Sequence, residues 1–107
     1  MIATPRADGT PHVVPVEVLV RNGKVYVWSQ ATSQKVRNAA RARRAALVGY
    51  KGHAFASVRG PVDIISIGAP GYDEITRGFL GKYEREETYG NDTLLEITPE
   101  HIATDRI

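Results

Sequence analysis

The chain has 107 residues, a mass of 11.7 kDa and a hydrophobic content of 42%, which fits one globular domain spanning residues 1–107. It has no apolar run near the roughly 18 residues that cross a bilayer and no signal-like start, so no membrane or export role is expected. The absence of cysteine excludes disulfides and thiolate chemistry and favours a cytoplasmic location. A chain this short buries a small fraction of its surface, and association with a second copy would enlarge its core. We therefore expect an oligomer.

Charge is distributed unevenly along the chain. Residues 1–60 hold ten Lys and Arg but only two acids, for a net charge of +8. Residues 61–107 hold four Lys and Arg and ten acids, for a net charge of −6. This asymmetry predicts an anion site in the first half of the chain.

The first predicted strand covers residues 12–20, where alternate valines share one face. Pro15 cannot donate a ladder hydrogen bond, so the strand must leave that side unpaired, at an edge, a bulge or a ligand site. Asn22-Gly23 tolerates the positive φ angles of a type I′ turn and predicts a hairpin into the next strand. On that strand we expect Tyr26 and Trp28 to face opposite sides, one in the core and one against a planar ligand.

Further elements follow from periodicity and from turn residues. We predict a mainly β fold, most simply a small β-barrel with two peripheral helices. The expected helices cover 35–41, with Thr32 or Ser33 as N-cap, and 72–85; the expected strands cover 45–50, 54–65 with an interruption at Gly60-Pro61, 93–98 and 101–104.

Residues 29–35 leave a strand, turn and open the first helix. A helix N-terminus offers free N–H groups and partial positive charge, so a phosphate there would be held by the backbone, the Ser33 hydroxyl and the Lys35 ammonium. A capped helix start with a solvated lysine accounts for the same residues, because Ser and Thr caps are common. Both interpretations remain open from the residues alone.

Other chemistry is not indicated. The five cations between Lys35 and Arg44 lack interleaved aromatic residues for base stacking, so we expect a solvated helix face and no nucleic-acid binding. His12, His53 and His101 are scattered, so no metal site is expected. We also find no serine nucleophile or acid–base pair, and predict no catalytic side chains.

Four segments resemble the flavin-binding split β-barrel superfamily, which contains the pyridoxamine 5′-phosphate oxidase-like proteins: ATPRADGTPHVVPVEVLV, NGKVYVW, SQATSQKVRNAARARRAAL and FASVRGPVDI. Two later segments, DEITRGFLGKY and LLEITPEHIAT, fit the branch that uses the 8-hydroxy-5-deazaflavin coenzyme F-420. The resemblance covers nearly the whole chain. It implies an FMN-binding split barrel that lacks the usual N-terminal helix.

The resemblance also implies a homodimer with two cofactor sites at the interface, each for FMN or the deazaflavin coenzyme F-420. The ring would lie against the strand at residues 14–16, and the phosphate would lie at the strand end and the helix start. The implied cofactor-binding residues are Val14, Pro15, Val16, Trp28, Ser29, Ser33, Gln34, Lys35, Asn38 and His53.

Three positions depart from the pattern of the relatives. Gln34 stands where relatives carry an arginine, and Val14 stands where the true pyridoxamine phosphate oxidases carry one. Oxidation of pyridoxamine 5′-phosphate is therefore not expected. Glu17 stands where relatives often carry an apolar residue, so we expect a different environment near the ring.

The activity implied is that of an oxidoreductase that transfers hydride between the bound cofactor and a small organic substrate. The protein would supply binding, orientation and electrostatics. The arginines after Lys35 favour the deazaflavin, whose anionic tail is longer. A cofactor-binding or carrier protein without turnover is the alternative.

Overall fold

The computed structural model describes residues 1–51, 54–82 and 92–106. These residues form eight strands and two helices. In chain order they are β1 (Ile2–Pro5), β2 (Pro11–Val14), β3 (Val18–Arg21), β4 (Lys24–Gln30), α1 (Gln34–Ala42), β5 (Arg44–Lys51), β6 (Ala54–Ser66), α2 (Tyr72–Lys82), β7 (Asp92–Ile97) and β8 (His101–Arg106).

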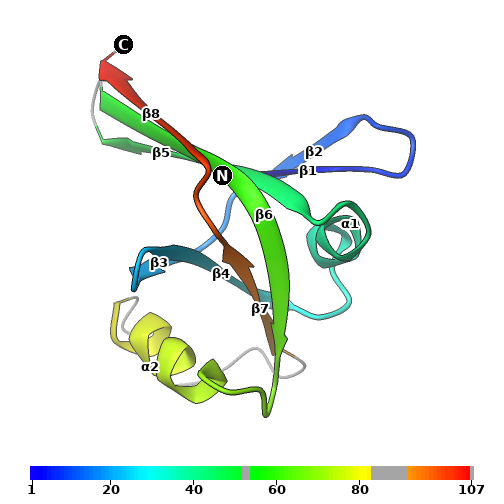
Figure 1. Cartoon of the computed structure of the whole chain (residues 1–107), viewed down its shortest axis with the longest axis vertical. Coiled ribbons are helices and arrows are strands. Elements are labelled where there is room, and N and C mark those ends of the chain that lie inside the picture. The colour runs from blue at the N-terminus through cyan, green and yellow to red at the C-terminus, as the bar shows by residue number, and fades with distance from the viewer. Residues whose placement is uncertain (52–53, 83–91, 107) are drawn as a thin grey trace.

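The strands form one antiparallel sheet in the order β2-β1-β5-β6-β7-β4-β3, with β8 added beside β6. Figure 1 shows β6 curving from the arm that it forms with β5 and β8 to the opposite half, where β7, β4 and β3 lie. Helix α1 packs on β1 and β6, and α2 packs on β3 and β4. The mainly β split barrel with two helices that the sequence predicts is confirmed.

Strand β6 belongs to both halves of the molecule. Residues up to Pro61 pair with β5, and residues from Val62 pair with β7. Gly60 lies at this change of partner, where an added Cβ would stand 1.9 Å from the backbone oxygen of Thr98. The strand is therefore continuous through Gly60-Pro61, and the predicted interruption is instead a change of neighbours that only glycine permits.

A single strand over residues 12–20 is wrong. Strand β2 ends at Val14 and pairs with β1, whereas β3 begins at Val18 and pairs with β4. Pro15 lacks an N–H and so favours a break in the ladder at this point. The two strands consequently lie in different halves of the sheet. The hairpin after β3 is confirmed, because Asn22 and Gly23 have φ angles of 55° and 75°.

The core has two parts, and β4 has one face in each. Val25 and Val27 lie in the cluster inside the barrel, which α1 covers. Tyr26 and Trp28 both lie in a second cluster, between the sheet and α2. The expectation that these two aromatic residues face opposite sides is wrong, because residues two apart on a strand share a face. Both faces of β4 are buried, since α2 covers what would otherwise be the outer one.

The first strand and the second helix differ from the expectations in extent. The sequence patterns did not predict β1, a four-residue strand paired on both sides by β2 and β5. The second helix ends at Lys82, and the rest of its predicted span lies outside the described residues. Neither described helix is long and apolar enough to span a membrane.

Candidate functional site

A cleft of about 520 Å³ opens beside the start of α1. Three segments line it: the connection between β2 and β3, the end of β4, and the start of α1. Its volume lies within the range of about 300–1,000 Å³ that is usual for small-molecule sites. We call it the α1 cleft, and its lining residues are Pro15, Val16, Glu17, Trp28, Ser29, Gln30, Ser33 and Lys35.

The β2–β3 connection forms one wall of the α1 cleft. Pro15, Val16 and Glu17 lie between the two strands and outside the ladders of the sheet. In a regular strand, neighbouring residues face opposite sides. These three consecutive residues therefore line the same cleft because the chain leaves the sheet at Pro15.

Trp28 lines the cleft at the end of β4. Its side chain is only 3% exposed, and its ring centroid lies 5.6 Å from that of Phe79 on α2. Tyr72 of α2 lies in the same buried cluster as Trp28 and Phe79. Burial is the main cause that raises the pKa of Tyr72, followed by the charge of Asp92. Helix α2 thus fixes the orientation of Trp28 at the cleft.

The start of α1 is open to an anion. Ser33 is the N-cap residue, but its side chain makes no capping hydrogen bond and there is no acid in the first turn. Its Oγ instead lies 2.9 Å from Ser29 Oγ. Because the first N–H groups of a helix have no acceptor inside the helix, they present partial positive charge at this end.

Lys35 brings a full positive charge to the same place. Its side chain is half-buried, and burial lowers the pKa of its ammonium group. Within the described part of the chain, no carboxylate forms an ion pair with it. An anion bound in the α1 cleft would therefore offset the cost of burying this charge.

Gln34 and Asn38, both predicted to bind the cofactor, do not line the cleft. Gln34 Nε2 donates to Asn38 Oδ1 at 2.7 Å, and Asn38 Nδ2 donates to Thr4 Oγ1 at 3.2 Å. Arg37 donates to Gln34 Oε1 at 2.7 Å and to the Thr32 carbonyl at 2.8 Å. Asn38 is fully buried. This network ties the first turns of α1 to β1 and to the preceding loop.

The other predicted residues fall into three groups. Pro15, Val16, Trp28, Ser29, Ser33 and Lys35 come together in the α1 cleft. Val14 packs against the barrel core instead, and His53 lies outside the described residues. Two lining residues were not on the predicted list: Glu17 and Gln30. Each directly follows predicted residues in the sequence, which is the signal that could have included them.

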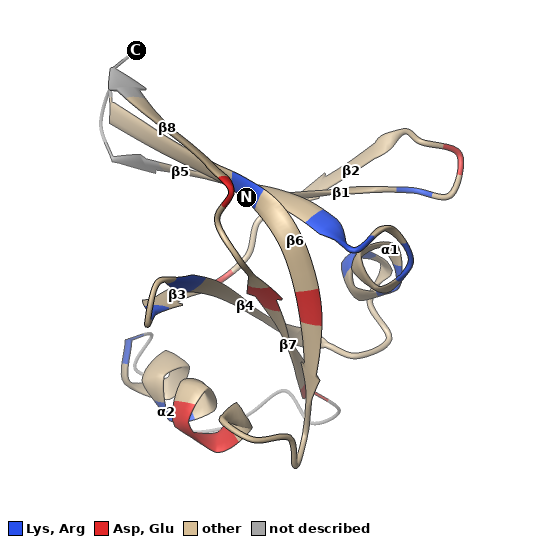
Figure 2. Ribbon diagram, in the orientation of Figure 1, with Lys and Arg blue, Asp and Glu red and all other residues tan. Residues whose placement is uncertain are grey.

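Positive charge gathers around α1 beyond the cleft. Figure 2 shows Lys and Arg on α1 and at the adjoining end of β5, and Asp and Glu on α2. Arg41 donates to the carbonyl of Pro5, and Arg43 lies 4.0 Å from Asp63. These side chains thus hold α1 to its neighbours as well as giving this side of the fold a positive potential. No group of three or more metal-binding side chains occurs among the described residues.

A protein-family comparison identifies the family from sequence. The model described as pyridoxamine 5′-phosphate oxidase matches residues 1–105, nearly the full length. The chain belongs to the pyridoxamine 5′-phosphate oxidase family. The resemblance to the flavin-binding split barrels is thereby confirmed. Among curated proteins, no sequence gives a significant match.

Solved structures share the fold of this pyridoxamine 5′-phosphate oxidase family member. An F420 reductase has a TM-score of 0.78 and 20% identity, over 95% of this chain and 86% of that one. General stress protein 26 from Bacillus anthracis has a TM-score of 0.74 and 20% identity, over 99% and 86% of the two chains. An FAD-binding protein from Mesorhizobium loti has a TM-score of 0.71 and 17% identity, over 96% and 82%. At these identities the likeness shows the fold alone.

Proposed function

We propose that this protein binds FMN or the deazaflavin coenzyme F-420 in the α1 cleft and uses it to transfer hydride to or from a small organic substrate. The observation that carries the proposal is the half-buried Lys35 beside an uncapped helix start, in a cleft that Pro15, Val16 and Trp28 also line. The family of the chain supports it, because flavin-type cofactors are bound across this superfamily.

The phosphate of the cofactor would lie at the start of α1. Ser33, Lys35 and the free N–H groups of the first turn would hold it together with Ser29. Each hydrogen bond to a charged group contributes about 1.5–3 kcal/mol, so two or three of them contribute about 3–9 kcal/mol, and the upper end of this range corresponds to roughly micromolar anchoring. Gln34 and Asn38 would act through the position of the helix, because their amides are engaged in the network with Thr4.

The ring of the cofactor would lie against the β2–β3 connection. Pro15 and Val16 offer apolar surface, and this segment lies outside the sheet ladders. The bound cofactor supplies the hydride chemistry, and the protein supplies binding, orientation and exclusion of water. No acid or base from the chain is required for that step.

The choice between the two cofactors rests on charge. The deazaflavin carries a longer anionic tail than FMN, and Arg37 and Arg41 add positive charge to α1 beyond Lys35. The likeness in fold to an F420 reductase agrees with this preference. We therefore place the deazaflavin first and FMN second.

The experiment is a titration of the purified protein with FMN and with the deazaflavin. Trp28 is the single tryptophan of the chain, so its fluorescence reports on the cleft without interference. We expect quenching with saturation by one cofactor, followed by substrate reduction in a panel of small organic acceptors. Binding of neither would contradict the proposal, and binding without turnover would favour a carrier protein.

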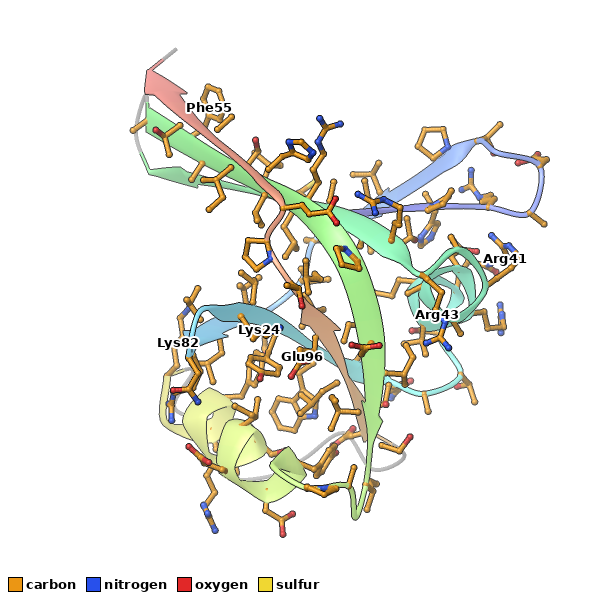
Figure 3. All side chains as sticks on the ribbon, viewed as in Figure 1. Lys24, Arg41, Arg43, Phe55, Lys82 and Glu96 are labelled. Carbon is orange, nitrogen blue, oxygen red and sulfur yellow. The ribbon has the colours of Figure 1, made fainter. Side chains whose placement is uncertain are left out.

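We also propose that the protein is a homodimer, as expected from the resemblance. An apolar groove of about 710 Å³ supports it, with Phe55 of the β5–β6–β8 arm on its wall (Figure 3). At its rim Val20 is 65% exposed and Ile102 70% exposed. Exposure of such apolar side chains to water is unfavourable, and an interface with a second copy of the chain would bury them.

Sedimentation equilibrium tests the dimer. We expect the mass of two chains for the wild type and of one chain for the double variant Val20→Glu, Ile102→Glu, because charge at the rim opposes burial. The variant Ile67→Glu changes an exposed apolar residue outside the groove and should remain dimeric. A monomeric wild-type protein would contradict this proposal.

A further inference from the structure

A second small pocket lies where the β1–β2 hairpin continues the sheet beyond β5 (Figure 1). Its volume is about 310 Å³, at the lower end of the range of about 300–1,000 Å³ for small-molecule sites. We call it the outer pocket. It shares no lining residue with the α1 cleft or with the apolar groove assigned to the dimer. It is therefore a separate candidate site.

The strand register places most of the lining residues on one face of the sheet. Cross-strand partners share a face, and so do residues two apart on a strand. Ala3 pairs with Ala46, which pairs in turn with Arg59. Pro5 pairs with Pro11 in the hairpin. The lining residues on this shared face are Ala3, Pro5, Pro11, Arg44, Ala46 and Arg59.

The shared face is the one that α1 does not cover. Thr4, between Ala3 and Pro5, accepts a hydrogen bond from Asn38 of α1. Leu47, the neighbour of Ala46, lies in the cluster inside the barrel. Because neighbours on a strand point to opposite faces, the outer pocket opens away from α1 and from the barrel core.

Two arginines stand side by side at this pocket. Arg44 lies opposite Pro61 in the register, so Arg59 is its diagonal neighbour across β5 and β6. Diagonal neighbours are about 7–8 Å apart, within reach of long side chains. Both arginines are exposed, and the described lining of the pocket contains no acid. Two guanidinium groups can therefore contact one oxyanion, each through paired N–H donors.

Glu100 holds one of these arginines and leaves the other available. Arg44 Nη2 lies 2.9 Å from Glu100 Oε1. The hydrogen bond and the charge of Arg44 lower the pKa of Glu100, with further contributions from His101 and Arg59. Among the described residues, no carboxylate forms an ion pair with Arg59. The cluster thus has an oriented guanidinium and retains a net positive charge.

The rest of the lining is small and apolar. Ala3 and Ala46 carry only methyl groups, which leaves space above the sheet between the hairpin and the arginines. Pro5 and Pro11 add two rings without N–H donors. A bare inorganic ion would leave this surface uncovered, whereas an organic group attached to the anion would pack against it.

We propose that the outer pocket binds a small organic phosphate, with the phosphoryl oxygens on Arg44 and Arg59 and the organic group against Pro5 and Pro11. A phosphate dianion matches two guanidinium groups in charge and in hydrogen-bond geometry. The site lies on another face from the α1 cleft, so the inference goes beyond the proposed function and does not depend on it.

Phenyl phosphate is the probe, and it is titrated into the protein while amide resonances are followed by NMR. The amides of Ala3, Ala46 and Arg59 report on the outer pocket, and those of Ser33 and Lys35 report separately on the α1 cleft. We expect saturable shifts at the outer pocket, with weaker binding of benzoate, which carries one charge, and none of phenol. Shifts confined to the α1 cleft, or equal affinity for phenyl phosphate and benzoate, would overturn the proposal.

Two variants should change the affinity of the outer pocket in opposite directions. Arg59→Gln should weaken binding there by roughly tenfold or more. Glu100→Gln should strengthen it, because the change frees Arg44 and removes a negative charge beside the ligand. Arg77→Gln, on the exposed side of α2, is the matched control and should change nothing. Unaltered affinity in both Arg59→Gln and Glu100→Gln would overturn the assignment, and should either variant not fold, the wild-type titration still decides.

Discussion

Ser29 Oγ and Ser33 Oγ lie 2.9 Å apart, one at the end of β4 and the other at the N-cap of α1. Because the Ser33 hydroxyl bonds across to Ser29, it does not fold over the first turn, and α1 begins without a side-chain cap. Such a cap contributes about 1 kcal/mol. The helix lacks that stabilisation, and its first N–H groups remain available to an anion.

This relationship predicts opposite effects of Ser33→Asp on stability and on binding. An aspartate at the N-cap should stabilise the free protein by about 0.5–1 kcal/mol, since it caps the helix and complements its dipole. The same carboxylate should repel the phosphate of FMN and weaken its binding. Urea unfolding and FMN titration measure the two effects, and riboflavin, which lacks the phosphate, is the control ligand. A variant that binds FMN as tightly as the wild type would contradict the phosphate site.

The contact between Asn38 and Thr4 predicts non-additive losses of stability. Asn38→Ala removes buried hydrogen bonds to Thr4 and Gln34 and should cost about 2–3 kcal/mol. Thr4→Val should cost about 1 kcal/mol by leaving the Asn38 amide without this acceptor. The double variant should cost less than both together, because either change alone already breaks the shared bond. Additive free energies of unfolding would show that the bond contributes nothing.

Features set by a few adjacent residues were predicted correctly from the sequence. The hairpin at Asn22-Gly23 follows from the positive φ angles that these residues tolerate, and α1 starts after Ser33 as its pattern indicates. Features set by contacts between distant parts of the chain were not predicted from the sequence. The change of partner at Gly60 depends on the approach of Thr98, from the other end of the chain, which no local pattern contains.

The sequence predicted which segments line the candidate site, but not which residues of α1 reach the cleft. The loop and strand end that line the cleft include the predicted Pro15, Trp28 and Ser29. Along the helix, Lys35 reaches the cleft, but Gln34 and Asn38 turn towards β1 because residues four apart share a helix face. A motif match assigns all of these residues to one ligand. Only the packing of α1 on β1 separates those that line the cleft from those that support it.

Two glycines predict contrasting effects of the same substitution. Gly60→Ala would place Cβ 1.9 Å from the backbone oxygen of Thr98, in the short connection between β7 and β8. We expect a loss of several kcal/mol, beyond the usual range of about 1–3 kcal/mol for overpacking. Gly49→Ala on β5 meets no atom within 4 Å, so its effect on stability should be within about 0.5 kcal/mol. Thermal unfolding of both variants measures the difference, and equal melting temperatures would contradict the described crossing of β6 and the chain near Thr98.

The raised pKa of Tyr26 predicts that the folded protein loses stability at high pH. Burial, and then its 2.8 Å hydrogen bond to Glu96, raise the pKa of Tyr26 from 10.0 to about 12. Between these values the folded state retains a proton that the unfolded chain releases, so stability decreases as pH rises from about 10 to about 12. Tyr26→Phe should reduce this dependence. Glu96→Gln should lower the pKa of Tyr26 while leaving it above 10, because burial remains.

The difference in affinity between FMN and riboflavin tests the central claim most directly. The two ligands share the ring and differ in the phosphate, which we assign to Lys35 and the start of α1. Wild-type protein should bind FMN more tightly than riboflavin. Lys35→Ala should weaken the affinity for FMN by roughly 10- to 100-fold and leave the affinity for riboflavin unchanged. Arg77→Ala on the exposed side of α2 should change neither. Equal affinities in the wild type, or an FMN preference that persists in Lys35→Ala, would contradict a phosphate site at the start of α1.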